Sequence, residues 1–417
     1  MTEQTWDAIV IGCGPAGASA AAVLALHGRR VLVLEREKFP RYHIGESLLP
    51  FTCYPLQRIG MIEKMRQTAF VKKFSVQFVS RSGKASHPFY FGDRYSPEVA
   101  QTWQVLRSEF DQMLMDNARE KGAAVIEEMA LKEYLMDGKR HIGVRVQDKA
   151  GKLHEFRAPM ILDCTGRDSF SASRKSWRIP DPKLNKIAVW TYYKGALRDE
   201  GINGGATTVA YVPEKGWFWY IPQHDDMVSV GVVGNATYLY RDGVREPKDV
   251  FHRAVKDNAW IEKYISHGVQ TGAYRVTGEY SFRSKYCAAD GLLLAGDAFG
   301  FLDPIFSSGV MLALKSGVMA GDEAHAALTA GDFSAKRFAK YGETLGQGID
   351  NMRRLVCAFY EQSFSFRKIC DTYDFAQGDI TDCLSGDVNK DFDRLWKACA
   401  EFAPVEDALP YGNPNEE

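Results

Sequence analysis

The sequence D-A-I-V-I-G-C-G-P-A-G, residues 7–17, decides which fold class this chain can adopt. Residues 7–11 are a short run rich in Ile and Val, which is typical of a buried parallel strand rather than an alternating surface strand. Gly12, Gly14 and Gly17 follow at the G-x-G-x-x-G spacing, and an Ala- and Leu-rich helix is expected over 18–27. The stretch therefore predicts a strand, a tight turn and a helix.

The glycines of this pattern have separate physical roles. Gly12 makes the tight turn, Gly14 lets the backbone approach a pyrophosphate, and Gly17 lets the helix pack against the strand. The phosphates then lie at the positive N-terminus of the helix that follows the glycines. The motif alone is a weak signal, because glycine turns between a strand and a helix are common.

A second apolar run gives the motif its context. Residues 31–34 are predicted as a buried strand, and Glu35 follows where an acidic residue would bind a ribose hydroxyl, with Arg36 next in the chain. The alternative is a structural turn that binds no ligand. Because the second strand and Glu35 follow the glycine motif, the pattern predicts a site for an adenine dinucleotide.

Length and composition limit the function classes. The 417 residues, 45% hydrophobic and 25% charged, can form about two closely associated domains. The net charge of -1 creates no overall attraction to nucleic acid or an anionic membrane. No apolar run approaches the roughly 20 residues that span a bilayer, and the polar start leaves no room for a signal peptide. The eight scattered cysteines lack metal-like spacing, so we expect reduced thiols, no metal and a cytoplasmic location.

Polar residues that follow the second strand are candidates for a binding site. Residues 40–50 form a loop bracketed by prolines, in which Arg41, Glu46 and Ser47 either bind a cofactor ring or cap the next helix.

Two adjacent lysines come next in the chain. Lys72 and Lys73 precede an alternating run that predicts a strand, and the pattern alone favours a solvated strand edge for both. Farther along, Arg107 lies in a helix expected over 105–125.

The middle of the chain changes character. Residues 129–146 and 153–157 are predicted as hairpin strands, and a buried strand from 161 returns to the first sheet. Short alternating runs over 185–285 predict a separate antiparallel sheet. In G-W-F-W-Y-I-P, residues 216–222, alternation turns four consecutive aromatic side chains to opposite faces, so both faces are covered or one lines a pocket.

The chain then returns to the first sheet with a buried strand that ends in G-D-A. Asp297 of this motif can accept a hydrogen bond from a ribose or ribitol hydroxyl. The segment F-L-D-P-I-F-S-S-G-V, residues 301–310, leads into a helix expected over 311–329. The backbone N–H groups of Ser308 and Gly309 would form a small anion site there. An ordinary serine N-cap is the alternative.

These patterns predict an α/β (α+β) fold with three parts. A discontinuous Rossmann-like dinucleotide-binding domain is expected over 1–80, 100–184 and 286–330. An antiparallel-sheet substrate domain is expected over 81–99 and 185–285, and a helical C-terminal region over 331–417.

Three separated motifs together resemble the FAD-dependent monooxygenases that share the p-hydroxybenzoate hydroxylase fold. They are the glycine motif, R-x-x-x-G-E-S after the second strand, and G-D-A. Arg107 resembles the arginine that this class places near the flavin. No second G-x-G-x-x-G occurs for a nicotinamide domain, so reducing equivalents arrive by transient NAD(P)H docking or as FADH2 made elsewhere. The FAD contacts that the resemblance implies are Gly12, Gly14, Pro15, Ala16, Gly17, Glu35, Arg36, Arg41, Ser47, Arg107, Asp297, Pro304, Gly309 and Val310.

Two further motifs resemble those of flavin-dependent halogenases. Residues 217–222 fit W-x-W-x-I-P and residues 301–309 fit F-x-x-P-x-x-S-x-G in every fixed position. The resemblance also implies a catalytic lysine, for which Lys73 is the better match and Lys72 the weaker. Phe306 stands where tryptophan halogenases have a Glu, which argues against tryptophan as the substrate and favours phenols, pyrroles or acyl groups.

The resemblance implies a mechanism and its partners. FADH2 from a separate flavin reductase, with O2, would oxidise chloride or bromide held by the backbone of Ser308 and Gly309. Hypohalous acid would pass through a tunnel to Lys73, whose ammonium polarises it or whose neutral amine forms a haloamine. Trp217 and Trp219 would separate the flavin from the substrate, which is a free small molecule or is tethered to a carrier protein.

Two other interpretations remain open at this point. One is an FAD-dependent monooxygenase or a geranylgeranyl-reductase-like enzyme on the same fold. The other is a flavin-binding protein without catalytic activity. Incorporation of chlorine or bromine into a product would distinguish a halogenase from both.

Overall fold

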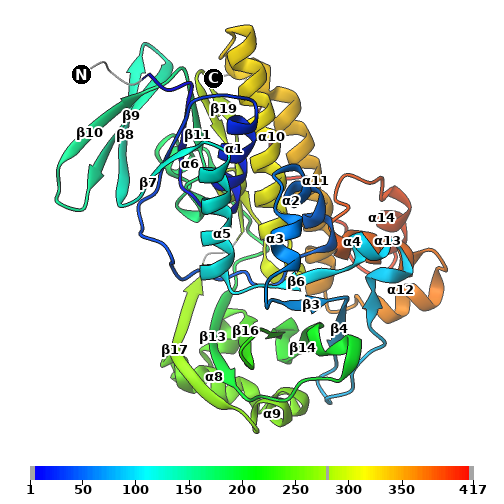
Figure 1. The fold of residues 1–417 in the computed structure, drawn as a ribbon. Coiled ribbons are helices and arrows are strands. Elements are labelled where there is room, and N and C mark those ends of the chain that lie inside the picture. Colours follow the sequence, from blue (N-terminus) through cyan, green and yellow to red (C-terminus); the bar gives the residue numbers. More distant parts are fainter. Residues whose placement is uncertain (1–4, 279–280, 413–417) are drawn as a thin grey trace.

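The computed structural model describes residues 5–278 and 281–412 of the chain. A parallel sheet lies in the upper part of the view and a larger mixed sheet below it, and the long helices α10 and α11 run side by side next to the parallel sheet (Figure 1). Further helices from the C-terminal part of the chain lie beside them.

The parallel sheet contains the motif that predicted the fold. Its strand order is β19-β20-β11-β1-β2-β7, in which the last five are parallel and β19 is antiparallel to β20. The strands are β1 (Ala8–Ile11), β2 (Val31–Leu34), β7 (Ala124–Ile126), β11 (Met160–Asp163), β19 (Ala288–Ala289) and β20 (Leu292–Leu294). The continuous apolar runs of β1 and β2 are fully buried, which confirms the prediction of parallel strands.

Helices α1 (Pro15–Leu26), α5 (Arg107–Glu120) and α10 (Ser308–Ala330) pack together beside this sheet. Helix α1 is buried over most of its length because Ala and Gly let α10 approach it closely. A Cβ atom at Gly317 of α10 would lie 2.2 Å from the Ala16 carbonyl oxygen. The predicted helices over 18–27, 105–125 and 311–329 are confirmed with small shifts of their ends.

A three-stranded antiparallel meander extends from the parallel sheet (Figure 1). It consists of β8 (Met129–Asp137), β9 (Arg140–Asp148) and β10 (Leu153–Arg157). The predicted hairpin strands are therefore confirmed. Short helices α2 (Cys53–Arg58), α3 (Ile62–Arg66), α4 (Pro97–Ala100) and α6 (Phe170–Arg174) fill the connections.

The second large sheet has seven strands in the order β17-β13-β16-β15-β14-β4-β5. They are β4 (Ser75–Val79), β5 (Phe89–Tyr90), β13 (Ile187–Lys194), β14 (Thr207–Tyr211), β15 (Trp217–Pro222), β16 (Met227–Gly234) and β17 (Val269–Gly278). The sheet is antiparallel as predicted, except that β4 and β14 pair in parallel. Because β4 belongs to this sheet, the chain enters it before residue 80. The domain limits themselves stay predictions.

Three more helices and two small sheets complete the middle of the chain. Helices α7 (Ala236–Leu239), α8 (Pro247–Val255) and α9 (Ala259–Ile265) cover the outer face of the seven-stranded sheet. One small sheet pairs β3 (Val71–Lys73) with β6 (Thr102–Gln104). In the other, β18 (Phe282–Ser284) lies between β12 (Arg178–Pro180) and β21 (Gly300–Phe301) and pairs with both.

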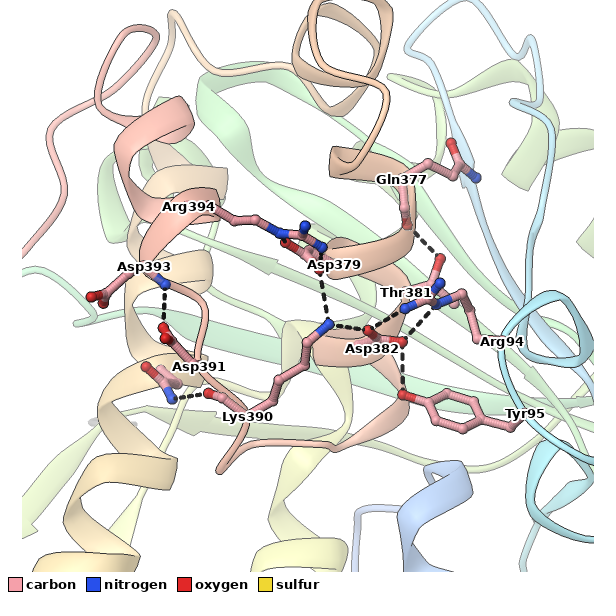
Figure 2. A network of polar contacts seen from close by, with 11 residues as sticks. Arg94, Tyr95, Gln377, Asp379, Thr381, Asp382, Lys390, Asp391, Asp393 and Arg394 are labelled. Atoms are coloured by element: carbon pink, nitrogen blue, oxygen red, sulfur yellow. Dashed lines mark hydrogen bonds and ion pairs between the residues drawn. The ribbon is translucent and has the colours of Figure 1, made fainter.

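The C-terminal part is helical, as predicted, with α11 (Ala339–Tyr360), α12 (Phe366–Thr372), α13 (Ala376–Ser385) and α14 (Asp393–Cys399). Charged groups anchor it to a distant segment (Figure 2). Asp382 of α13 accepts hydrogen bonds of 2.9 and 2.8 Å from Arg94 and one of 2.8 Å from Tyr95. Lys390 donates to Asp382 and, at 2.9 Å, to Asp379. This network holds residues 91–95 against α13.

Among the described residues, no helix combines the length and the apolar character needed to cross a membrane.

Candidate active site

A cavity of about 390 Å³ lies where the parallel sheet meets the seven-stranded sheet. Its wall includes four stretches that carry motifs: the glycine turn after β1, the loop over 41–47, strand β15, and residues from 295 to 313. The three motifs that resemble those of FAD-dependent monooxygenases and the two that resemble those of halogenases therefore meet at one cavity. Most of the predicted FAD contacts line it; Gly17 lies just behind the wall.

The glycine turn has no room for side chains. Gly12 has a φ of +93°, and a Cβ atom there would lie 2.4 Å from the Cys164 carbonyl oxygen. A Cβ atom at Gly17 would lie 1.9 Å from the Gly12 carbonyl oxygen. Gly14, Pro15 and Ala16 line the cavity at the N-terminus of α1. The backbone there is open to an anion that accepts hydrogen bonds from the helix N-terminus.

Glu35 lies at the same end of the cavity and is held in place by the backbone. Its Oε2 accepts a hydrogen bond of 2.7 Å from the Cys13 N–H, and its Oε1 accepts one of 2.9 Å from the Glu37 N–H. Arg36 lines the cavity mouth and pairs with Asp168 on the opposite side. A fixed carboxylate beside the glycine turn is the arrangement that binds a ribose hydroxyl.

Two arginines line the cavity farther along and share one carboxylate. Arg107 forms two hydrogen bonds with Asp111, of 2.8 and 2.9 Å, and Arg41 lies 3.2 Å from the same carboxylate. Arg107 also donates to the Ile44 carbonyl oxygen at 2.7 Å, which fixes the backbone beside Gly45. Because two guanidinium groups share one carboxylate, positive charge remains for an anionic ligand.

Asp297 stands on the other side of the cavity, after β20. Burial raises the pKa of its carboxyl to about 6, and the positive charges of Arg167 and Arg107 oppose that rise. A carboxyl group in this position can accept a hydrogen bond from a sugar or ribitol hydroxyl.

The tryptophans of β15 form one wall of the cavity. Trp217, Trp219 and Ile221 face the cavity, whereas Phe218 and Tyr220 on the opposite face pack against α8 and α9. The sequence left open whether both faces of this strand are covered or one face lines a pocket. In the structure one face packs against helices and the other lines the cavity.

Lys73 lies behind the cavity wall and is not solvated. Only 1% of it is exposed, and its Nζ donates hydrogen bonds of 2.9 Å to Ser47 Oγ and 3.0 Å to the Leu48 carbonyl oxygen. Lys72 is exposed, so the strand-edge interpretation is right for Lys72 and wrong for Lys73. Lys73 itself is not among the described residues that line the cavity, but Ser47 is.

The electrostatic state of Lys73 follows from its surroundings. Burial lowers the pKa of its ammonium group to about 7. The Phe91 ring lies 5.4 Å from Nζ, and in the described part of the chain no carboxylate forms an ion pair with it. Neutral amine and ammonium are therefore both accessible near neutral pH.

The other motif, residues 301–310, reaches the cavity at the start of α10. Ser307 has a φ of +56°, and the helix begins with Ser308 and Gly309. Gly309 lines the cavity, and a Cβ atom there would meet nothing within 4 Å. Ser308 is buried behind it, with no hydrogen-bond partner for its Oγ. Pro304 and Val310 also line the cavity.

The residues present fit an FAD molecule. The glycine turn and the N-terminus of α1 offer backbone N–H groups that suit the pyrophosphate. The fixed carboxylate of Glu35 suits the ribose, and Asp297 suits the ribitol.

Comparisons with known proteins agree with this fit. Residues 5–343 match a family described as an FAD binding domain. The 1H-pyrrole-2-carbonyl-(peptidyl-carrier protein) chlorinase of Pseudomonas fluorescens is 31% identical over 93% of this chain and 90% of its own length. The corresponding brominase of Pseudoalteromonas luteoviolacea is 30% identical over 81% of this chain and 82% of its own length. The structure of the flavin-dependent brominase Bmp2 superposes with a TM-score of 0.85 and 28% identity, covering 96% of this chain and 97% of that one.

The chain belongs to the flavin-dependent halogenases. It is an enzyme that uses FAD and a halide, as the motifs predicted, and its fold is the one predicted.

Sequence reasoning missed several polar residues of this halogenase. Trp217 Nε1 donates 2.8 Å to the Tyr360 hydroxyl, which donates 2.9 Å to Asp303 Oδ2. Tyr360 comes from α11, 143 residues from Trp217, so no local pattern indicated the contact. Asp111 could have been found, because Arg107 and Asp111 stand four residues apart on one helix.

The surroundings of Phe306 are apolar. Its ring lies 5.9 Å from that of Phe359 and 6.2 Å from that of Phe366. Phe359, Phe364 and Phe366 are buried, whereas the neighbouring Tyr360 accepts a hydrogen bond from Trp217 of the tryptophan wall. Phe306 therefore lies in an apolar setting.

Proposed function

We propose that this halogenase chlorinates or brominates an electron-rich ring, most simply a pyrrole-2-carbonyl group carried as a thioester on a carrier protein, and that Lys73 directs the oxidised halogen to it. The single observation that carries the proposal is the position of Lys73. It is buried beside the cavity, hydrogen-bonded through Ser47 to the cavity wall, and has no carboxylate partner among the described residues.

Reduced FAD bound in the cavity would supply, with O2, the oxidant that turns a halide ion into hypohalous acid. The halide would be held by the backbone N–H groups of Ser308 and Gly309, where a glycine keeps the cavity open. The tryptophan wall would keep the organic substrate on the far side. Lys73 would then receive the hypohalous acid as a hydrogen-bond donor or as a nucleophilic amine.

Two observations support the substrate class, and a third supports the source of the reductant. The resemblance puts Phe306 at the position of the tryptophan-halogenase carboxylate, and its ring packs against Phe359 and Phe366, which favours a substrate that needs no carboxylate there. Two of the similar proteins act, by name, on a carrier-bound pyrrole. The sequence contains no second dinucleotide motif, which supports a separate flavin reductase as the source of FADH2.

A panel assay tests this function. The purified chain receives FAD, NADH, a flavin reductase, O2 and either chloride or bromide, and is offered carrier-bound pyrrole-2-carbonyl, free pyrrole-2-carboxylate, simple phenols and tryptophan. The expected product is halogenated carrier-bound pyrrole, identified by its isotope pattern. Halogenation of tryptophan alone would contradict the substrate proposal, and oxidation of FADH2 without any halogenated product would contradict the function.

Two matched variants test the role of Lys73. Lys73→Ala is expected to abolish halogenation while FAD remains bound, because the directing amine is removed from a site that FAD does not contact. Lys72→Ala, one residue away and exposed, is the control and should keep activity. Full activity of Lys73→Ala would remove Lys73 from the mechanism.

A further inference from the structure

A chain of hydroxyl groups connects the protein surface to the cavity. Tyr42, which is 40% exposed, has its hydroxyl 3.0 Å from that of Tyr192. Tyr192 donates a hydrogen bond of 2.8 Å to Glu46 Oε1, and Glu46 lines the cavity. The three side chains come from the loop over 41–47 and from β13, so the large sheet completes a path that the loop alone could not form.

The direction of each hydrogen bond in this chain is fixed by its neighbours. Trp190 Nε1 can only donate, so the Tyr42 oxygen accepts its bond of 2.7 Å. The single hydrogen of Tyr192 points to the Glu46 carboxylate, so Tyr42 must donate to Tyr192. All the O–H groups therefore point from the surface to Glu46.

Glu46 is placed to exchange a proton with the cavity. Only 2% of the residue is exposed, and burial raises the pKa of its carboxyl. The groups around it that oppose this rise are Ser229, Tyr192, Gln223 and, through its positive charge, Arg107. Arg107 is already bonded to Asp111, and the exposed Arg275 lies over the Tyr42 ring at the outer end. Glu46 Oε2 has no hydrogen bond of normal geometry, which leaves it available to a ligand.

Halogenation consumes one proton from solvent. Written in full, FADH2 + O2 + X⁻ + H⁺ + R–H gives FAD + R–X + 2 H2O, with oxygen reduced by two electrons from FADH2 and two from the halogenated carbon. The halide enters as an anion and leaves in a neutral carbon–halogen bond, so a proton must enter with it. Glu46 is a carboxyl group of the cavity wall that hydrogen bonds join, through Tyr192, to the exposed Tyr42, so it is placed to take that proton from the surface.

We propose that Tyr42, Tyr192 and Glu46 form a proton relay that delivers this proton from the surface to the cavity. The relay rests on the halogenation proposed above. It assigns a role to three residues that have none in that proposed function. Glu46 gives its proton to the oxygen that leaves the cavity as water. Tyr192 then protonates Glu46, Tyr42 protonates Tyr192, and a surface water reprotonates Tyr42, so that no residue changes its charge over a turnover.

The first test needs no cofactor. The infrared spectrum of the protein without FAD should contain the carbonyl stretch of a protonated, buried carboxylic acid that disappears in Glu46→Gln. The difference between wild type and this variant separates Glu46 from Asp297 and Asp303, whose pKa values are also raised. In Tyr192→Phe the band should remain but shift, since one hydrogen bond is lost. Absence of a Glu46-dependent band at any pH at which the protein is folded would overturn the proposal.

The second test measures turnover with reductase, NADH, O2 and bromide. Tyr192→Phe is expected to lower the rate of product formation roughly 10- to 100-fold, as expected for loss of a positioned proton donor, and to change the pH profile. Tyr193→Phe is the matched control, because this neighbouring buried tyrosine lies on the opposite face of β13. A wild-type rate and pH profile in Tyr192→Phe would overturn the relay.

The two proposals fail in different ways. If wild type forms no halogenated product, the proposed function fails and the relay fails with it. If wild type forms product and the Tyr192→Phe and Tyr193→Phe variants behave alike, only the relay fails.

Discussion

The Nζ atom of Lys73 donates a hydrogen bond of 2.9 Å to the Oγ atom of Ser47. Ser47 in turn lies 2.7 Å from the Thr207 hydroxyl, and both hydroxyl groups belong to the cavity wall. The lysine is thus joined to the flavin side of the site by a residue of the G-E-S motif and by one of the large sheet. This contact links two parts of the chain that are expected to act in one reaction.

Replacing Lys73 with Met should remove activity and stabilise the fold. Burial lowers the pKa of Lys73 to about 7, so the folded protein loses this proton before the unfolded chain does. Wild-type stability should therefore rise between about pH 7 and about pH 10, by about 1.4 kcal/mol for each pKa unit of the shift. Below about pH 7 the full cost of burying the charge remains. Urea unfolding across this range measures the effect.

The variants around Lys73 provide the controls for that measurement. The free energy of unfolding of Lys73→Met should not rise between about pH 7 and about pH 10, and this variant should be more stable than wild type at about neutral pH. Lys72→Met changes an exposed side chain, so it should change neither the pH dependence of stability nor the activity. A Lys73→Met protein less stable than wild type at about neutral pH would show that the buried ammonium is better compensated than its contacts indicate.

The central motif and its surroundings could be predicted from the sequence because each depends on local chemistry. Strand β1, the glycine turn and α1 follow from a continuous apolar run and from three glycines that have no room for a Cβ atom. The two faces of β15 follow from the alternation of its aromatic residues. Lys73 could be chosen over Lys72 only through the resemblance, since burial of one of two adjacent lysines depends on β6, 30 residues farther along the chain.

Replacing Tyr360 with Phe should loosen the tryptophan wall. The variant removes the hydroxyl that accepts from Trp217 and donates to Asp303, leaving two buried polar groups without this partner. We expect a loss of about 1–3 kcal/mol in the free energy of unfolding. We also expect less halogenated product for each FADH2 oxidised, because the wall no longer holds one position. Product yield and oxygen consumption measure the ratio.

Tyr54→Phe is the control for that variant, because Tyr54 is 50% exposed. It should match wild type in both stability and product yield. If Tyr360→Phe loses stability but keeps the wild-type product yield, the hydrogen bond supports the fold and does not position the tryptophan for the reaction.

Replacing Asp382 with Asn should detach residues 91–95 from α13. Burial alone would raise the pKa of Asp382, but hydrogen bonds from Arg94 and Lys390 hold it below its ordinary value. The pairing therefore stabilises the fold above about pH 4 and is lost as pH falls below that value. Because both cations are partly exposed, we expect a loss of about 1–3 kcal/mol near neutral pH.

Asp371→Asn provides the comparison, since Asp371 and Arg367 are both exposed and their pair should contribute little. Guanidinium unfolding at about neutral pH and at about pH 3 should show the two variants converge with wild type as the carboxylates become protonated. A difference between Asp382→Asn and wild type that is equally large at acid pH would mean that packing, rather than charge, is lost.

The contacts that sequence reasoning missed are those between distant segments. Tyr192 and Glu46 are 146 residues apart, and the pairing of β4 with β14 joins segments 131 residues apart at Gln77 and Thr208. Alternating apolar and polar residues predict a strand and its apolar face, but they do not indicate which strand pairs with it. The polar groups that the sheet brings to the loop over 41–47 therefore became visible only in the structure.

A methyl group at position 309 should change the halide preference. Gly309 has an ordinary φ and open space where a Cβ atom would lie, so Gly309→Ala should fold normally and project its methyl into the cavity. If the halide binds at the start of α10, the larger bromide should lose more apparent affinity than chloride, by roughly tenfold if the methyl costs about 1.4 kcal/mol more for bromide. Halogenation rates measured against the concentration of each halide give the two values. Gly346→Ala, within α11 and outside the cavity, is the control for adding a methyl group to a helix, because its backbone is also ordinary and its Cβ atom would meet only Arg283 Nη1, at 3.8 Å. Equal losses for both halides, or none, would place the halide elsewhere in the cavity.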